Sequence, residues 1–176
     1  MTQIGFSTPS YFNPISWLVR KITKSRTSHA WFKYYDQDFE MDMVMEAHEL
    51  GFRLIPFERF KKHNEVVAIW STSQNLQEGL KWAATWLGSA YDFGGLLGMA
   101  KVILGRILSR RWRNPTQNSK AMFCSEMAVS VLQLSGVPWA RDLVASEVSP
   151  QDLMELFERQ AALGDEVQTH DTGQSR

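Results

Sequence analysis

The chain has 176 residues, of which 44% are hydrophobic and 22% charged, and its 19 Lys and Arg balance its 19 Asp and Glu. This composition is ordinary for one soluble globular domain, and the zero net charge offers no electrostatic reason to expect nucleic-acid binding. The single cysteine excludes an intrachain disulfide framework and any multi-cysteine zinc site. The four histidines show no metal-ligand spacing, so we expect neither a metal nor a cofactor.

The N-terminal residues 1–10 are polar and lack the charged-then-apolar pattern of a signal peptide. No apolar run approaches the ~20 residues that a membrane-spanning helix requires. We therefore expect the protein to be made and folded in the cytosol. A function outside the cell would require delivery by another route, for example in a phage particle.

The predicted elements follow one another as a helix, a cluster of antiparallel strands, and then mostly helices. Apolar residues at helical spacing predict a first helix over 14–22, after which the period changes to two. The segments predicted as strands are 29–35, 39–47, the first part of 52–60, and 65–70. The later segments predicted as helices are 75–87, 96–112, the stretch that begins at Cys124, and 150–159. This order predicts an α+β fold with a small antiparallel sheet packed against helices, in one domain over 1–161 with a polar, disordered tail over 162–176.

Segments 29–35 and 39–47 are predicted to pair as a hairpin with a two-residue turn at Gln37 and Asp38. In that register one face is wholly apolar, formed by Ala30, Phe32, Tyr34, Met41, Met43 and Met45. The opposite face pairs Lys33 with Asp42 and His29 with Glu46. A slip of one residue would bring charges onto the apolar face, whereas a slip of two keeps both faces intact.

His29 has a carboxylate opposite it in this pairing, which is the arrangement that a general base needs. The carboxylate of Glu46 would hold the imidazole in one tautomer and stabilise its protonated form. A two-residue slip would place His48 opposite His29 instead. Glu46 is therefore the first choice for the orienting residue and His48 the second. The plainer interpretation is that His29 caps a strand edge and that Glu46 is a solvated charge.

Cys124 lies where an apolar approach gives way to Cys-Ser-Glu and then to an apolar helical pattern. This pattern predicts a thiol on the first turn of a helix that is buried along one side. The partial positive charge of a helix N-terminus stabilises a thiolate, and a histidine would hold the proton. A lone cysteine can also be a small buried hydrophobe. Its role therefore depends on the residues that the fold places beside it.

The stretch 99–113 has cations and no acid, namely Lys101, Arg106, Arg110, Arg111 and Arg113. A basic amphipathic helix of this kind can lie on an anionic membrane surface. The plainer interpretation is a helix docked on its own domain or on a protein partner, with its arginines in water. Lys101, Arg106, Arg110 and Arg113 are the residues expected to form this membrane or partner surface.

Several short segments, by their order and spacing along the chain, resemble the circularly permuted papain-like hydrolases. These hydrolases are the permuted branch of the NlpC/P60 superfamily. In that branch the histidine strand precedes the cysteine helix. The segments that resemble it are 27–32, 44–47 with 51–53, 91–95, 123–126 and, in style, 148–153. Two features depart from the family pattern. The bulky pair Trp31-Phe32 narrows the expected pocket, and the insertion between Gly95 and Cys124 is long and basic.

The resemblance implies a cysteine hydrolase with Cys124 as nucleophile, His29 as base and Glu46 as the third polar residue. It also implies a substrate or oxyanion contact by Tyr91, and Ser125 is a second candidate for such a contact. The expected substrate is a peptide or acyl compound, cleaved by an amidase or peptidase, with cell-wall peptides as one expected class. The alternatives are a lipid acyl hydrolase or acyltransferase, and a non-catalytic assembly module that docks through 99–113.

Overall fold

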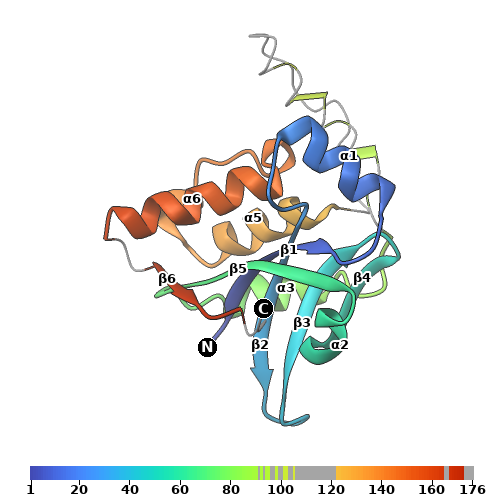
Figure 1. Cartoon of the computed structure of the whole chain (residues 1–176). Helices are drawn as coiled ribbons and strands as arrows, with labels where there is room; N and C mark the ends of the chain where they lie inside the picture. The colour runs from blue at the N-terminus through green and yellow to red at the C-terminus, as the bar shows by residue number, and fades with distance from the viewer. Residues whose placement is uncertain are drawn as a thin grey trace.

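The computed structural model describes residues 1–90, 92, 94, 95, 98, 101, 102, 105, 122–164 and 167–172. Within that part of the chain, six strands form one antiparallel sheet in the order β4-β3-β2-β1-β5-β6 (Figure 1). The strands are β1 Gln3–Pro9, β2 His29–Asp36, β3 Met41–His48, β4 Gly51–Pro56, β5 Asn64–Thr72 and β6 Val167–His170. The helices are α1 Pro14–Thr23, α2 Phe57–Lys61, α3 Gln77–Ala84, α5 Cys124–Leu134 and α6 Pro150–Ala162. The predicted α+β class is therefore confirmed.

The sheet is buried on both faces because helices pack on each side of it (Figure 1). Alternate residues of a strand point to opposite faces. Phe32 and Met45 belong to the main core together with the apolar residues of α5 and α6. Trp31 points to the other face and packs against Phe57 and Phe60 of α2, with ring centroids 5.7 and 4.7 Å away. The strands that carry the candidate site are therefore held from both sides.

The β2–β3 hairpin pairs two residues away from the register that the sequence predicts. Phe32 lies opposite Met45, where the prediction placed Ala30. The predicted faces are retained, since a two-residue slip returns every side chain to the same side of the sheet. The Lys33–Asp42 ion pair forms diagonally instead of directly across, with 3.0 Å between Nζ and Oδ2.

Asp36 explains this slip because it lengthens the turn to residues 37–40. Its Oδ1 accepts hydrogen bonds from the backbone N–H groups of Asp38 and Phe39, each at 3.0 Å. Aspartate favours turns through this side-chain-to-backbone bonding. Glu40 then adopts a left-handed φ of 50° before β3 begins. The predicted two-residue turn is therefore too short.

Two strands do not appear in the prediction. β1 lies in the middle of the sheet between β2 and β5, and its Ile4 and Phe6 are fully buried. The predicted disordered tail over 162–176 is wrong for the described residues 167–170, because these form β6 and pair with β5. His170 Nε2 lies 2.8 Å from Ser71 Oγ in that pairing. Short polar strands gain their order from a neighbouring strand, which local sequence does not show.

Gly5 of β1 lies against the indole of Trp31. A Cβ at position 5 would come within 2.2 Å of two ring atoms, and Trp31 is fully buried and donates from Nε1 to Ser7 Oγ at 3.1 Å. We expect Gly5→Ala to lower the free energy of unfolding by about 1–3 kcal/mol, measured by urea denaturation. In a Trp31→Leu background the same change should cost much less. An equal cost in both backgrounds would show that the indole is not the obstacle.

Candidate active site

Helix α5 presents the thiol on its first turn, as predicted. The helix begins at Cys124, directly after Phe123, whose backbone is extended with φ −101° and ψ 169°. The carboxylate of Glu126 accepts a hydrogen bond from the Phe123 N–H at 3.4 Å, which satisfies one N–H ahead of the helix. The thiol is 2% exposed, and its Sγ lies 4.0 Å from the carbonyl oxygen of Ser28. Cys124 thus lies against the residue that precedes β2.

His29 is the first residue of β2 and has both a thiol and a carboxylate beside its ring. Its Nε2 lies 2.5 Å from Glu46 Oε2, and it also makes a side-chain hydrogen bond with Cys124. Because Nε2 is engaged by Glu46, Nδ1 is the ring nitrogen that remains for the thiol. Phe60 of α2 stacks on the imidazole with centroids 6.4 Å apart and planes inclined by 27°. The ring is therefore held by contacts on its edge and on its face.

Glu46 of β3 is fully buried and bridges two cations. Its Oε2 contacts His29, and its Oε1 receives both Nε and Nη2 of Arg53 at 2.7 Å. Arg53 lies directly opposite Glu46 in the β3–β4 hairpin. Two nitrogens of one guanidinium on a carboxylate form a strong, geometrically specific ion pair. The structure therefore adds Arg53 to the site.

Sequence reasoning assigned no role to Arg53, although a signal for it was present. The tight turn that joins β3 to β4 places position 53 opposite position 46. Gly51 makes this turn possible, because its φ of 114° is one that glycine adopts readily. A Cβ at Gly51 would also lie 2.7 Å from the carbonyl oxygen of Ser89. Recognition of this turn would have predicted the Glu46–Arg53 pair.

Cations and an anion alternate along the site, since the carboxylate of Glu46 lies between the imidazole of His29 and the guanidinium of Arg53. Burial lowers the pKa of His29, but the hydrogen bonds and charges of Cys124 and Glu46 outweigh it and raise that pKa to about 10. Burial raises the pKa of Glu46, yet its hydrogen bond with His29 and the charges of His29 and Arg53 bring it below 4.5. His29 is therefore protonated and Glu46 ionised at neutral pH. An imidazolium beside Cys124 favours the thiolate, which is the nucleophilic form.

A second carboxyl lies beside the start of the cysteine helix. Burial raises the pKa of Glu126 to about 7, the bond from the Phe123 N–H opposes this rise, and the nearby carboxylate of Asp92 adds to it. Asp92 is buried, and its Oδ1 accepts a hydrogen bond from the Gly95 N–H at 2.8 Å. Sequence reasoning gave Glu126 and Asp92 no separate role. Their proximity depends on a long-range contact that local pattern does not reveal.

The structure also describes the predicted site residues Ser125 and Lys101. The Ser125 side chain is fully buried, and its Oγ donates to the carbonyl of Val148 at 2.7 Å. Its hydroxyl therefore fixes α5 to the segment before α6, and the predicted substrate or oxyanion contact by Ser125 stays a prediction. Lys101 is exposed in a helical segment. Tyr91, Arg106, Arg110 and Arg113 lie outside the described residues.

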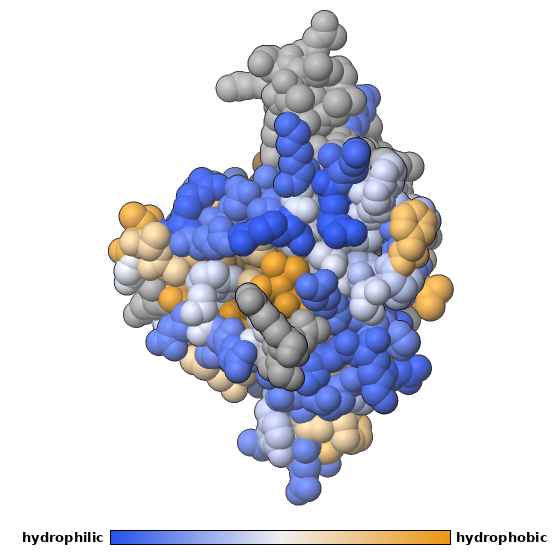
Figure 2. All heavy atoms as spheres, in the orientation of Figure 1, coloured by the Kyte–Doolittle hydropathy of each residue, from blue (hydrophilic) through white to orange (hydrophobic). Residues whose placement is uncertain are grey.

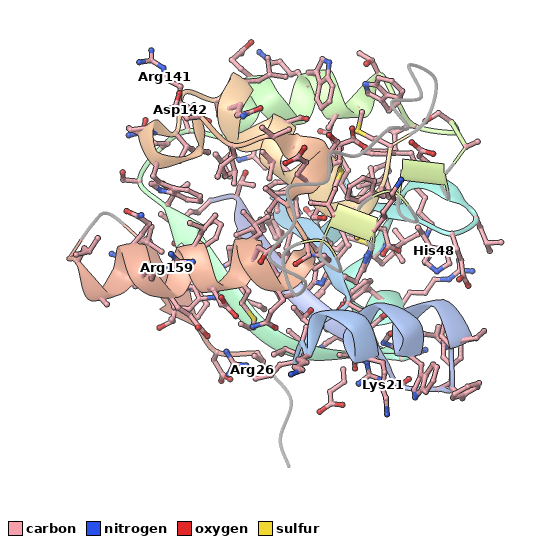
Figure 3. The ribbon with its side chains drawn as sticks, turned by 90° about the horizontal axis from the view of Figure 1, so that it is seen from above. Lys21, Arg26, His48, Arg141, Asp142 and Arg159 are labelled. Atoms are coloured by element: carbon pink, nitrogen blue, oxygen red, sulfur yellow. The ribbon has the colours of Figure 1, made fainter. Side chains whose placement is uncertain are left out.

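His48, the alternative orienting residue, lies at the end of β3 (Figure 3). Glu46 takes the bond to His29, and His48 instead accepts at Nδ1 from the Leu50 N–H at 3.2 Å. Burial lowers the pKa of His48. A cavity of about 340 Å³ lies between this residue and His29, and its lining also includes Ser28 and Arg53. Through this cavity a small molecule can approach His29 from the side of the β3–β4 turn.

No family model and no curated protein sequence matches the chain. Among solved structures, the chain is similar to the crystal structure of metalloprotein yiiX (DUF1105) from Escherichia coli O157:H7, with a TM-score of 0.56 and 18% identity. The match covers 96% of this chain and 94% of that chain. Among the described residues, no helix is both long and apolar enough to cross a bilayer. The chain therefore has the fold of yiiX, in agreement with the permuted papain-like resemblance of its motifs.

Proposed function

We propose that the protein is a cysteine-dependent hydrolase that forms an acyl-enzyme on Cys124. His29 would carry the proton, Glu46 would orient the imidazole, and Arg53 would act as a positioning residue that keeps Glu46 in place. The observation that supports this most directly is the engagement of one imidazole by both a buried carboxylate and the thiol of a helix N-terminus. A nucleophile, its base and a third group that orients the base are the parts that covalent catalysis requires.

The proposed reaction has two steps. The Cys124 thiolate attacks the carbonyl carbon, and the tetrahedral intermediate collapses as His29 gives its proton to the leaving amine, leaving a thioester. Water then attacks the thioester carbon while His29 accepts its proton, and the thiolate is released with the acid product. Backbone N–H groups at the start of α5 are the expected donors to the oxyanion.

An amide is the proposed substrate because its amine leaving group must be protonated as the C–N bond breaks. The imidazolium of His29 supplies that proton. Peptides, including those of the cell wall, are the first substrates to test, and acyl esters or amides of lipids are the second. A non-catalytic assembly module is the alternative function, and the 2% exposure of the thiol is the observation that favours it.

The similar structure yiiX is described as a metalloprotein. In the described part of this chain, no three His, Cys, Asp or Glu side chains are grouped as metal ligands. His29 and Glu46 are bonded to each other, and the second oxygen of Glu46 is occupied by Arg53. These donors do not form a metal site, and no proposed step is assigned to a metal.

Reaction with p-nitrophenyl acetate and p-nitroacetanilide tests the proposed function. We expect a burst of nitrophenol from p-nitrophenyl acetate. We also expect one acetyl group per chain on Cys124, detected by intact-mass and peptide mass spectrometry. Cys124→Ala should show no acetylation, and His48→Ala should retain it because Glu46, and not His48, makes the hydrogen bond to His29. If neither compound forms an adduct on Cys124 of the native chain, the result would favour the non-catalytic module.

A further inference from the structure

Exposed apolar side chains lie on the segments that contribute to the lining of the cavity beside His29. They are Tyr11, Phe12, Trp17 and Leu50, with exposed fractions of 51, 79, 48 and 84%. Tyr11 and Leu50 also line the cavity. Asn13 Nδ2 donates to Glu49 Oε2 at 3.0 Å, which joins the β1–α1 loop to the β3–β4 turn. Figure 2 shows hydrophobic surface at the right of the view, where these two segments meet.

Cations follow these apolar residues along helix α1. Trp17 and Lys21 are four residues apart in α1 and both are exposed, so they share one outward face. Lys24, also exposed, directly follows the helix with a left-handed φ of 51°. Figure 3 shows Lys21 extending outward from α1, and its Nζ lies 5.8 Å from the Trp17 ring centroid. The charged side chains of residues 1–35 are all basic, namely Arg20, Lys21, Lys24, Arg26 and Lys33. Arg26 forms an ion pair with Glu158, so Lys21 and Lys24 contribute most to the outward charge.

We propose that this surface, the α1 rim (Tyr11, Phe12, Trp17, Lys21, Lys24 and Leu50), docks the protein on an anionic lipid bilayer. Aromatic rings favour the headgroup level of a membrane, and lysines beside them are attracted to anionic lipids. An exposed mixture of aromatic rings and cations suits such a surface. Glu49, which precedes Leu50, is half-buried and accepts a hydrogen bond from Asn13. Docking through the rim would place the cavity beside His29 against the bilayer. The surface is distinct from the stretch 99–113 and does not depend on the proposed reaction.

Cosedimentation with vesicles tests the α1 rim. The Cys124→Ala protein is mixed with vesicles of phosphatidylcholine, alone or with phosphatidylglycerol. We expect binding to the anionic vesicles that is roughly tenfold or more tighter than to the neutral ones and that weakens in high salt. Phe12→Ser/Leu50→Ser and Lys21→Glu/Lys24→Glu should each lower the affinity by roughly tenfold or more.

Matched variants on other surfaces serve as controls. Tyr35→Ser/Phe39→Ser removes two exposed aromatic rings from the β2–β3 end, where their exposed fractions are 54 and 61%. Lys81→Glu/Arg141→Glu reverses two exposed charges, and Arg141 lies far from Lys21 in Figure 3.

Both controls should bind anionic vesicles as tightly as the Cys124→Ala protein does. Circular dichroism should show that every variant is folded. Equal binding to neutral vesicles, or equal losses in the controls, would overturn the proposal. Binding that depends on the lysines alone, with Phe12→Ser/Leu50→Ser unchanged, would also overturn it and would favour an acidic protein partner. Acetylation of Cys124 in solution is measured separately, so a failure here leaves the proposed reaction standing.

Discussion

At about pH 6, iodoacetamide is expected to alkylate Cys124 at least about tenfold faster in the native chain than in His29→Ala. The hydrogen bonds with Cys124 and Glu46 outweigh burial and raise the pKa of His29 to about 10, so its ring is protonated at that pH. The imidazolium then stabilises the thiolate beside it. Without His29 the thiol loses this partner, and an unperturbed cysteine ionises only near pH 8.5. Because the chain has one cysteine, intact-mass spectrometry at a series of pH values follows this site alone.

Access to the thiol does not explain such a result, although Cys124 is only 2% exposed. Truncation of His29 removes a side chain next to the thiol, so access alone would make the variant react faster. His48→Ala is the matched control, because His48 lines the same cavity and makes no hydrogen bond to His29. A native rate that rises only near pH 8.5, or one that is equal in His29→Ala, would contradict the Cys–His pair.

Glu46→Ala is expected to lower the free energy of unfolding by about 3–5 kcal/mol at neutral pH. The change leaves the guanidinium of Arg53 and the imidazolium of His29 without their shared anion in a buried site, and removal of one partner from a buried ion pair has this cost. Glu46→Gln should cost less, because the amide oxygen still accepts one hydrogen bond. Urea denaturation measures both. Glu78→Ala, which removes an exposed carboxylate paired with Lys81, is the control that should change little.

The pH dependence of these differences follows from the pKa shifts. The pKa of Glu46 is lowered below 4.5, so its contribution to stability is full above about pH 4.5 and is lost as pH falls through the folded value. The pKa of His29 is raised from 6.5 to about 10, so its contribution is full below about pH 6.5 and is lost as pH rises toward about 10. The cost of Glu46→Gln should therefore be greatest between about pH 4.5 and 6.5. A cost that does not vary with pH would show that the ion pairs are not its source.

The sequence predicts that the thiol lies on the first turn of a helix, and it predicts the two faces of the hairpin, because both depend on local periodicity. The start of α5 at Cys124 follows from the apolar helical pattern after it. The faces of β2 and β3 follow from alternation, and alternation is unchanged by a two-residue slip. For that reason His29 and Glu46 meet as predicted, although the contact is diagonal across the hairpin instead of direct.

The features that the sequence does not predict are the hairpin register, the place of Arg53 in the site and the central position of β1, and they depend on particular contacts. The slip itself results from the bonds that the Asp36 carboxylate makes to its own turn. Arg53 enters the site through the β3–β4 turn, and the Ser125 hydroxyl bonds to the carbonyl of Val148 before α6. The central position of β1 is decided by its two neighbours, since Gly5 and Pro9 weaken the strand signal of its own residues. The contacts of Arg53, Ser125 and β1 join segments that a local pattern treats separately.

The C-terminal strand also determines how the sheet meets other molecules. A strand at the edge of a sheet presents unpaired N–H and C=O groups, to which a second chain can add and begin aggregation. Without β6, that edge would be β5, which has nine residues and includes the buried Ile69 and Trp70. β6 pairs with residues 69–72 of β5 and covers that part of the edge with four residues, of which Gln168 and Thr169 are exposed and polar. The C-terminal strand therefore shields the part of this edge that contains Ile69 and Trp70 from pairing with a second chain.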